Sequence, residues 1–225
     1  MIWLCYAIML AVPYLLAGIN TSIIVAKVKT GKDIREMGSG NAGLTNTLRV
    51  LGKGAAGIVL LGDVSKAAIA VVIVRLAFRF IGGVDTADIE AGMTWVEYIA
   101  TFMAIVGHCF PLYYGFKGGK GVLAAISAIF VLDWRIACIL LGIFIVLVAI
   151  TKYVSLGSVI ASSCFFIVSP AFGYFVDHNP AFIANMIIAA FCSGLIVFRH
   201  RENLKRLASH TEKKLGEKSK DENSK

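Results

Sequence analysis

The sequence predicts an all-α integral membrane protein with about seven transmembrane helices, some of them short or re-entrant. The first observation is composition, because 58% of the 225 residues are hydrophobic and only 16% are charged, against about 25% charged in soluble domains. The second is the division of the chain into apolar segments, and the third is the distribution of lysine and arginine between them. Seven spans of about 20 residues each leave no room for a second, soluble domain.

Seven apolar segments account for most of the chain. The first lacks the basic flank of a cleavable signal peptide, so it is predicted to be a span. Residues 121–150 would rise about 45 Å as one helix, whereas two crossings of a hydrocarbon core of about 30 Å need about 60 Å. This stretch is therefore predicted to form either two short spans or a re-entrant hairpin. The segments lie at 2–25, 55–80, 95–114, 121–132, 135–150, 154–176 and 180–198.

Lysine and arginine are unequally divided between the two sides of this arrangement. Eighteen lie on one side and two, Arg79 and Arg135, on the other. Cytoplasmic loops are rich in these residues, which predicts an external N-terminus and a cytoplasmic C-terminus. The net charge of +8 follows from this orientation and requires no nucleic-acid partner. Residues 1–198 are thus predicted to form a single polytopic membrane domain, and 199–225 a basic cytoplasmic tail.

Two glycine-rich clusters fall on the predicted cytoplasmic side. The first, 38–49, combines three glycines with hydroxyl and amide side chains and with Arg49, whose guanidinium can bind an anion through two hydrogen bonds. An ordinary capped turn is the alternative. The second, 115–121, joins glycines to Lys117, Lys120 and the start of a helix, which together favour anion binding. A flexible basic turn is the alternative.

Two further polar clusters lie at the ends of predicted spans. Ser155 and Ser158 are three residues apart, so they share one face of a helix, although helix capping also explains them. His200 and Asn203 have the same spacing, which the topology does not require. A solvated basic helix end is the alternative for this last cluster.

Three ionisable residues lie close to these clusters in the sequence. Asp63 and Lys66 are three residues apart in an apolar segment, where ionisable groups are costly and tend to pair. They are predicted to form a structural ion pair rather than a catalytic one. His108 is a lone histidine before the second cluster, and is predicted to be packed and hydrogen bonded.

Taken together, the four clusters predict an anion site on one membrane face. The sequence has no carboxylate pair suited to glycoside chemistry, no GxSxG nucleophile and no metal-ligand spacing. None of its histidines is followed by aspartate at the fifth position, the pattern of one large acyltransferase class. These observations leave a membrane enzyme or a transporter that handles a small molecule bearing phosphate.

Three segments resemble the motifs of bacterial acyl-phosphate:glycerol-3-phosphate acyltransferases of the PlsY type. They are GSGNAGLTN at 38–46, KGGKG at 117–121 and HREN at 200–203. The likeness covers the whole chain, including GDVSK at 62–66. It departs from the family pattern at 42–44, where Ala-Gly-Leu stands in place of Pro-Gly-Ala, an exchange that removes no polar group.

The resemblance implies a reaction and a location. An acyl phosphate would donate a fatty acyl group to the 1-hydroxyl of sn-glycerol 3-phosphate. The products would be 1-acyl-sn-glycerol 3-phosphate (lysophosphatidic acid) and phosphate, in the first acylation step of bacterial phospholipid synthesis. The enzyme would need no cofactor or metal, and its active site would lie on the cytoplasmic face of the plasma (inner) membrane. Its partners would be the two substrates, the lipid bilayer and a cytoplasmic enzyme that produces acyl phosphate.

A transporter or flippase for a phosphorylated metabolite is the alternative function. Transporters of this kind are expected to show internal repeats and polar residues at the depth of the membrane midplane. The two halves of the sequence show no clear repeat, and the polar clusters gather at one predicted face. The sequence therefore favours the enzyme.

The resemblance also implies roles for individual residues, and Glu202 is expected to be structural. The predicted catalytic residues are Ser39, Arg49, Lys120, His200 and Asn203. The predicted substrate- and phosphate-binding residues are Asn41, Thr45, Asn46, Gly118, Gly119, Gly121, Ser155, Ser158 and Arg201.

The charge asymmetry makes a prediction about orientation. A phosphatase that is active only outside the cytoplasm should be silent when fused to the C-terminal tail, because the tail is predicted to stay inside. The same phosphatase fused after Asp85, in a loop predicted to be external, should be active and serves as the control. High activity of the tail fusion would contradict the predicted orientation.

Overall fold

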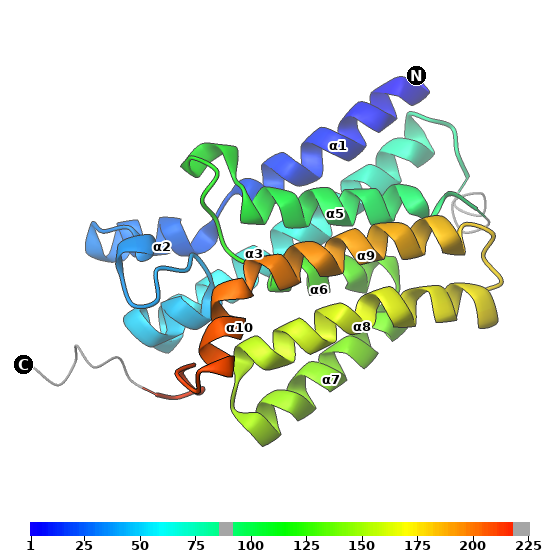
Figure 1. Ribbon diagram of the computed structural model, residues 1–225. Coiled ribbons are helices and arrows are strands. Elements are labelled where there is room, and N and C mark those ends of the chain that lie inside the picture. The colour runs from blue at the N-terminus through cyan, green and yellow to red at the C-terminus, as the bar shows by residue number, and fades with distance from the viewer. Residues whose placement is uncertain (86–91, 218–225) are drawn as a thin grey trace, which may run out of the picture.

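The computed structural model describes residues 1–85 and 92–217, and these residues contain helices and no strand. The long helices run roughly side by side as a bundle. The N-terminus lies at one end of the bundle, and α2 and α10 lie at the other, which we call the basic end (Figure 1). The helical elements are α1 (Ile2–Gly18), α2 (Thr21–Thr30), η1 (Ile34–Glu36), α3 (Leu44–Phe80), α5 (Trp95–Cys109), η3 (Leu112–Tyr114), α6 (Val122–Leu132), α7 (Trp134–Thr151), α8 (Val154–Phe175), α9 (Phe182–Arg199) and α10 (Arg201–Ala208).

Six helical stretches of the described chain are long and apolar enough to cross a membrane. The outside of the bundle is covered by large apolar side chains such as Leu61, Phe80 and Ile150, which are 70%, 73% and 75% exposed. A soluble protein rarely exposes so many, whereas lipid tails cover them at no cost. The predicted all-α integral membrane fold is therefore confirmed. The six stretches are Ile2–Thr30, Leu44–Phe80, Trp95–Tyr114, Trp134–Thr151, Val154–Phe175 and Phe182–Arg199.

The stretch 121–150 forms two helices of unequal length. The 11 residues of α6 rise about 16 Å, which is about half of a hydrocarbon core. The 18 residues of α7 rise about 27 Å, enough for a full crossing. Asp133 separates the two helices, and its Oδ1 accepts a hydrogen bond from the Arg135 backbone N–H at 2.8 Å, which caps α7. Of the two helices in this stretch, only α6 is thus too short to cross the hydrocarbon core.

The first predicted span is broken into two helices near Asn20. The Asn20 side chain accepts a hydrogen bond from the Ile23 backbone N–H at 3.2 Å and so caps α2. Lys66 Nζ donates to the Ile19 carbonyl at 2.8 Å, which satisfies a backbone group at the break. As a result α2 forms a separate helix at the basic end (Figure 1).

The second span begins earlier than the sequence predicts. α3 begins at Leu44 rather than near 55, and it bends at Gly52, whose φ is 82°. Glycine adopts this positive φ without the strain that a side chain would add. The early start places Thr45 and Arg49 on a helix, although the sequence suggested a loop.

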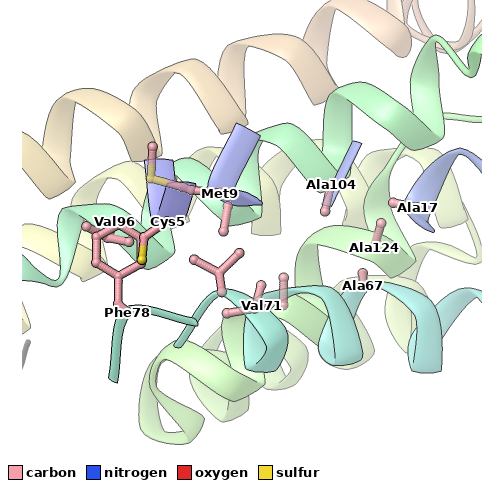
Figure 2. Close-up of a cluster of buried hydrophobic side chains, with 12 residues drawn as sticks. Cys5, Met9, Ala17, Ala67, Val71, Phe78, Val96, Ala104 and Ala124 are labelled. Atoms are coloured by element: carbon pink, nitrogen blue, oxygen red, sulfur yellow. The ribbon is translucent and has the colours of Figure 1, made fainter. Parts of the chain in front are cut away.

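Small side chains allow α1, α3, α5 and α6 to pack closely (Figure 2). Ala17, Ala67, Ala104 and Ala124 come from these four helices and are fully buried, with Phe78 filling the end of the cluster. Small residues let helix backbones approach one another in membranes, where packing replaces the hydrophobic effect between helices. A second buried cluster joins α5 and α6 to α7, α8 and α9, so α5 and α6 form the centre of the bundle.

The contact between α1 and α5 leaves no room for a side chain at Gly107. A Cβ there would collide with the backbone carbonyl of Tyr14. We expect Gly107→Ala to destabilise the protein by about 1–3 kcal/mol, the usual cost of overpacking. The measurement is the melting temperature in detergent.

The matched control for this prediction is Gly142→Ala in α7, because no atom lies within 4 Å of a Cβ built there. This change should be neutral or slightly stabilising, since alanine is the better helix former. Equal melting temperatures of the two variants would contradict the close contact.

Candidate active site

The four polar clusters predicted from the sequence meet around one cavity at the basic end. This polar cavity has a volume of about 1020 Å³. It is bordered by the loop before α3, the loop 115–121, the start of α8, and α10 with the residues after it. Of the 14 predicted site residues, Gly119 alone is not in its lining. The others are Ser39, Asn41, Thr45, Asn46, Arg49, Gly118, Lys120, Gly121, Ser155, Ser158, His200, Arg201 and Asn203.

In the first cluster, Asn46 holds the backbone and Arg49 is left free. Asn46 Oδ1 accepts from the Ser39 backbone N–H at 2.8 Å, and Nδ2 donates to the Met37 carbonyl at 2.9 Å. The Asn46 amide therefore fixes the loop that carries Ser39. Arg49 forms neither a hydrogen bond nor an ion pair within 1–85 and 92–217, so its guanidinium is available to an anion in the polar cavity.

In the second cluster, the backbone of Gly118 and Gly119 is fully engaged. Their N–H groups donate to the carbonyls of Cys109 and His108, both at 3.1 Å. Arg199 in turn donates from Nε to the Gly119 carbonyl and from Nη2 to the Gly118 carbonyl, both at 3.0 Å. These two glycines therefore lack free amides for a phosphate, and they hold the loop 115–121 between α5 and α9.

The absence of a side chain at Gly119 is required by packing. A Cβ there would collide with the His108 ring and would lie 2.5 Å from the Ala42 carbonyl. On the other side of the loop, Arg35 Nη1 donates to the carbonyls of Tyr114 and Lys117 at 2.8 and 2.9 Å. Arg35 and Arg199 thus fix this loop through hydrogen bonds to its carbonyls. From the sequence, both count only as signals of membrane topology.

Lys120 and the start of α6 remain as anion donors in the second cluster. The first backbone hydrogen bond of α6 runs from Ala125 N–H to the Gly121 carbonyl at 2.8 Å. The preceding amides of the first turn have no acceptor within the helix, and they carry the positive end of the helix dipole. Val122 and Leu123 line the polar cavity, which places this helix end at its wall.

Lys120 is a buried cation. Burial lowers the pKa of Lys120 to about 8, while the charge of Glu212 opposes that shift. Its Nζ donates a hydrogen bond to Asn203 Oδ1. At pH 7 the ammonium group is therefore still charged, and little water is available to screen it.

Glu212 is a site residue that the sequence did not reveal. Its Oε1 accepts from Ser155 Oγ at 2.8 Å and from Asn203 Nδ2 at 2.6 Å, and its Oε2 accepts from Arg206 Nε at 2.7 Å. Burial alone would raise the pKa of Glu212, but these hydrogen bonds outweigh it and lower that pKa. The ionised carboxylate orients the Asn203 amide so that Oδ1 faces Lys120. Nothing in the sequence indicated this role, because Glu212 follows the end of α10 and has no helical spacing to the other site residues.

His200 is a neutral hydrogen-bonding group rather than a cation. Burial, together with the nearby charge of Lys120, lowers the pKa of His200 to about 4. Nδ1 lies 2.8 Å from the Ile196 carbonyl, which can only accept a hydrogen bond. Nδ1 therefore carries the ring proton, and Nε2 is left as an acceptor.

Three other predicted residues have local partners. Ser158 Oγ donates to the Val154 carbonyl at 2.9 Å in its own helix. The Arg201 guanidinium lies over the Phe198 ring, 4.5 Å from its centre. Glu202, expected to be structural, forms an exposed ion pair with Lys205 at 3.1 Å.

An apolar groove continues from the polar cavity into the bundle. Its volume is about 100 Å³, and Val122, Leu123 and Phe144 line both spaces. α6, α7, α8 and α9 form its walls, and Ile129 and Phe165 lie at its far end, judged by their positions along these helices. The remaining lining residues are Ala125, Ile126, Leu140, Leu141, Ala161, Ser162, Cys192, Ser193 and Ile196.

Known proteins match almost the whole chain. The family model described as glycerol-3-phosphate acyltransferase matches residues 7–210. A glycerol-3-phosphate acyltransferase of Clostridioides difficile is 45% identical over 95% of this chain and 97% of its own. The enzyme of the same name from Halalkalibacterium halodurans is 43% identical over 91% of this chain and 93% of its own.

A solved structure shares the fold as well. The crystal structure of PlsY (YgiH), an integral membrane glycerol 3-phosphate acyltransferase, in its glycerol 3-phosphate form, has a TM-score of 0.78 and 30% identity, and the match covers 94% of this chain and 96% of that one. The same protein has also been solved in a lysophosphatidic acid form, with a TM-score of 0.73. These matches favour the enzyme over the transporter. The chain therefore belongs to the glycerol-3-phosphate acyltransferase family.

Proposed function

We propose that the protein transfers a fatty acyl group from acyl phosphate to the 1-hydroxyl of sn-glycerol 3-phosphate. Lysophosphatidic acid and phosphate would be the products. The observation that carries the proposal is the continuity of the polar cavity, rich in anion-binding groups, with an apolar groove inside the bundle. A donor with a phosphate head and an acyl chain fits across that junction, and a second, small phosphate fits the wide cavity.

The chemistry needs positioning more than it needs a reactive side chain. An acyl phosphate is a mixed anhydride and is already activated. The acceptor hydroxyl oxygen bonds to the acyl carbonyl carbon, and the bond from that carbon to the phosphate oxygen breaks. The departing phosphate takes the hydroxyl proton, so neither an acyl-enzyme nor a side-chain base is required. The protein must hold two anions close together in the correct orientation.

The free donors of the polar cavity suit this task. Arg49, Lys120 and the first turn of α6 supply positive charge at its wall, where phosphates and a developing oxyanion are stabilised. Ser39 is presented by the loop that Asn46 fixes. His200 Nε2 is an acceptor, which can receive a hydrogen bond from a substrate hydroxyl.

We place the active site on the cytoplasmic side of the bacterial inner membrane. Support comes from the lysine and arginine residues concentrated at the basic end, around the polar cavity. From there the apolar groove would receive acyl chains at the depth of the inner leaflet. A cytoplasmic enzyme that makes acyl phosphate would supply the donor.

The direct test uses purified protein in detergent with palmitoyl phosphate. Phosphate release should depend on added glycerol 3-phosphate, and mass spectrometry should detect lysophosphatidic acid in equal amount. Release that ignores the acceptor, or lysophosphatidic acid formed only from acyl-CoA, would refute the proposed donor.

The buried cation at Lys120 predicts an alkaline limit to activity. Because the pKa of Lys120 is lowered to about 8, the ammonium is lost above that pH, and kcat/KM should fall. The Lys120→Arg variant should have a lower kcat/KM but should not lose activity in this alkaline range, since arginine stays charged. In Glu212→Gln, the negative charge that holds the pKa of Lys120 up is gone, so the alkaline fall in kcat/KM should begin at a lower pH. The measurement is kcat/KM from pH 6 to 10, which reports the free enzyme. An identical alkaline fall in Lys120→Arg would exclude Lys120 as its source.

The far end of the apolar groove predicts control of chain length. Ile129→Phe adds volume there, so kcat/KM for palmitoyl phosphate should fall at least about tenfold, which a clash of one or two methylenes can cause. Octanoyl phosphate should be affected less than about threefold. Ile187→Phe is the control, because Ile187 lies on α9, is half exposed on the outside of the bundle, and does not line the groove. A parallel loss with both donors would argue against the groove as the acyl site.

A further inference from the structure

Two buried side chains in the wall of the polar cavity each carry a polar atom without a hydrogen-bond partner among the described residues. Asp63 of α3 is 1% exposed and His108 of α5 is 4% exposed. Oδ2 of the Asp63 carboxylate and Nδ1 of His108 have no hydrogen-bond partner among these residues, whereas Oδ1 of Asp63 is held by Lys66. Buried polar groups are almost always hydrogen bonded in native proteins, so these atoms point to an occupant that completes them.

Asp63 does form the ion pair with Lys66 that its spacing predicted. Lys66 Nζ lies 2.8 Å from Asp63 Oδ1, and the same ammonium, which has three N–H donors, also donates to the Ile19 carbonyl. The charge of the carboxylate is therefore balanced at Oδ1, while Oδ2 is left without a hydrogen bond. A further cation is not required there, because Lys66 already supplies the positive charge.

The position of these groups relates them to the anion site. Asp63 and His108 line the same cavity as Arg49 and Lys120. The His108 ring lies directly against Gly119, where an added Cβ would collide with it. The recess formed by Asp63 and His108 is therefore part of the cavity that the loop presenting Lys120 also borders.

The chemistry of the recess selects its ligand. An ionised carboxylate accepts hydrogen bonds and repels phosphate, so a phosphate group will avoid Asp63. A hydroxyl can donate to the carboxylate and accept from His108 Nδ1–H, which completes both groups at once. Two sources of such a hydroxyl exist, an ordered water molecule and a hydroxyl of the acceptor substrate.

We propose that the Asp63–His108 recess binds the C2 hydroxyl of glycerol 3-phosphate and thereby selects a polyol phosphate over other small phosphates. Asp63 accepts the hydrogen bond of that hydroxyl, and His108 donates to its oxygen. This inference rests on the proposed function for the identity of the acceptor but not of the donor. It assigns Asp63 a specificity role in addition to its ion pair.

The test compares two acceptors that differ by one hydroxyl. 3-Hydroxypropyl phosphate keeps the phosphate and the primary hydroxyl of glycerol 3-phosphate but lacks the C2 hydroxyl. With palmitoyl phosphate as donor, the wild-type protein should prefer glycerol 3-phosphate in kcat/KM by about 10- to 100-fold, the value of a hydrogen bond to a charged group. Asp63→Asn should reduce this preference to less than about threefold, mainly by slowing the reaction of glycerol 3-phosphate.

The controls separate recognition from structure. Ser65→Ala changes an exposed side chain of the same helix, whose Oγ bonds only to the Leu61 carbonyl, and it should keep the wild-type preference. Asp63→Asn leaves Lys66 without its partner and can impair folding. The double variant Asp63→Leu/Lys66→Met removes both charges and should show the same loss of preference.

Calorimetric binding of the two acceptors provides a readout that needs no donor. Wild-type protein should bind glycerol 3-phosphate more tightly than 3-hydroxypropyl phosphate, and the Asp63 variants should bind the two alike. Equal use and binding of both acceptors by the wild type, or an equal loss for both in the Asp63 variants, would overturn the inference in favour of a water or a structural pair. Selective binding without turnover of palmitoyl phosphate would instead refute the proposed donor and leave the recess assignment in place.

Discussion

The site depends on the backbone of Gly118 and Gly119. Their amides bond to the end of α5, their carbonyls bond to Arg199 at the end of α9, and Gly119 packs against Ala42 from the first polar cluster. Segments far apart in the sequence thus converge on two residues that have no side chain. Glycine is required at both positions because a Cβ would collide with the segments that approach the backbone there.

Polar residues around the cavity divide into those that fix the backbone and those left available. The side chains of Asn46 and Arg199 form hydrogen bonds with backbone carbonyls and amides of the loops and so fix them. Glu212 is surrounded by three donors and orients Asn203 toward Lys120. Arg49 and the first turn of α6 keep their donors open. Preorganisation of this kind lets a site bind anions without rearranging its own dipoles.

The short helix α6 connects the polar and apolar parts of the site. Its first residues, Val122 and Leu123, line both the polar cavity and the apolar groove. The positive end of the helix dipole therefore meets the place where the groove opens. A phosphate bound at that end would leave its acyl chain directed along α6, between α7, α8 and α9. The helix that looked too short for a span is the one that joins the two environments.

Hydropathy and charge in the sequence were sufficient to predict the all-α membrane fold, because lipid demands long apolar helices whose backbone bonds are internal. The same local chemistry indicated an anion site, since glycines beside lysine, arginine and hydroxyls are unusual next to apolar spans. Only the tertiary structure decided what each group does. Gly118 and Gly119, which were expected to bind phosphate, use their amides to hold the loop. Glu212 is identified as a site residue only by its contacts, such as the hydrogen bond from Ser155, 57 positions away in the sequence.

Asp63 shows the same division between sequence and structure. Its ion pair with Lys66 could be predicted, since three residues make one helical turn and buried charges pair. The unpartnered Oδ2 of its carboxylate, on the same cavity as His108, could not, because it depends on which residues of α3 and α5 line a common cavity. The sequence by itself determined the class of fold and the kind of chemistry. Contacts between distant residues decided which groups are occupied and which remain free for a ligand, since a hydrogen bond depends on distances that no local pattern encodes.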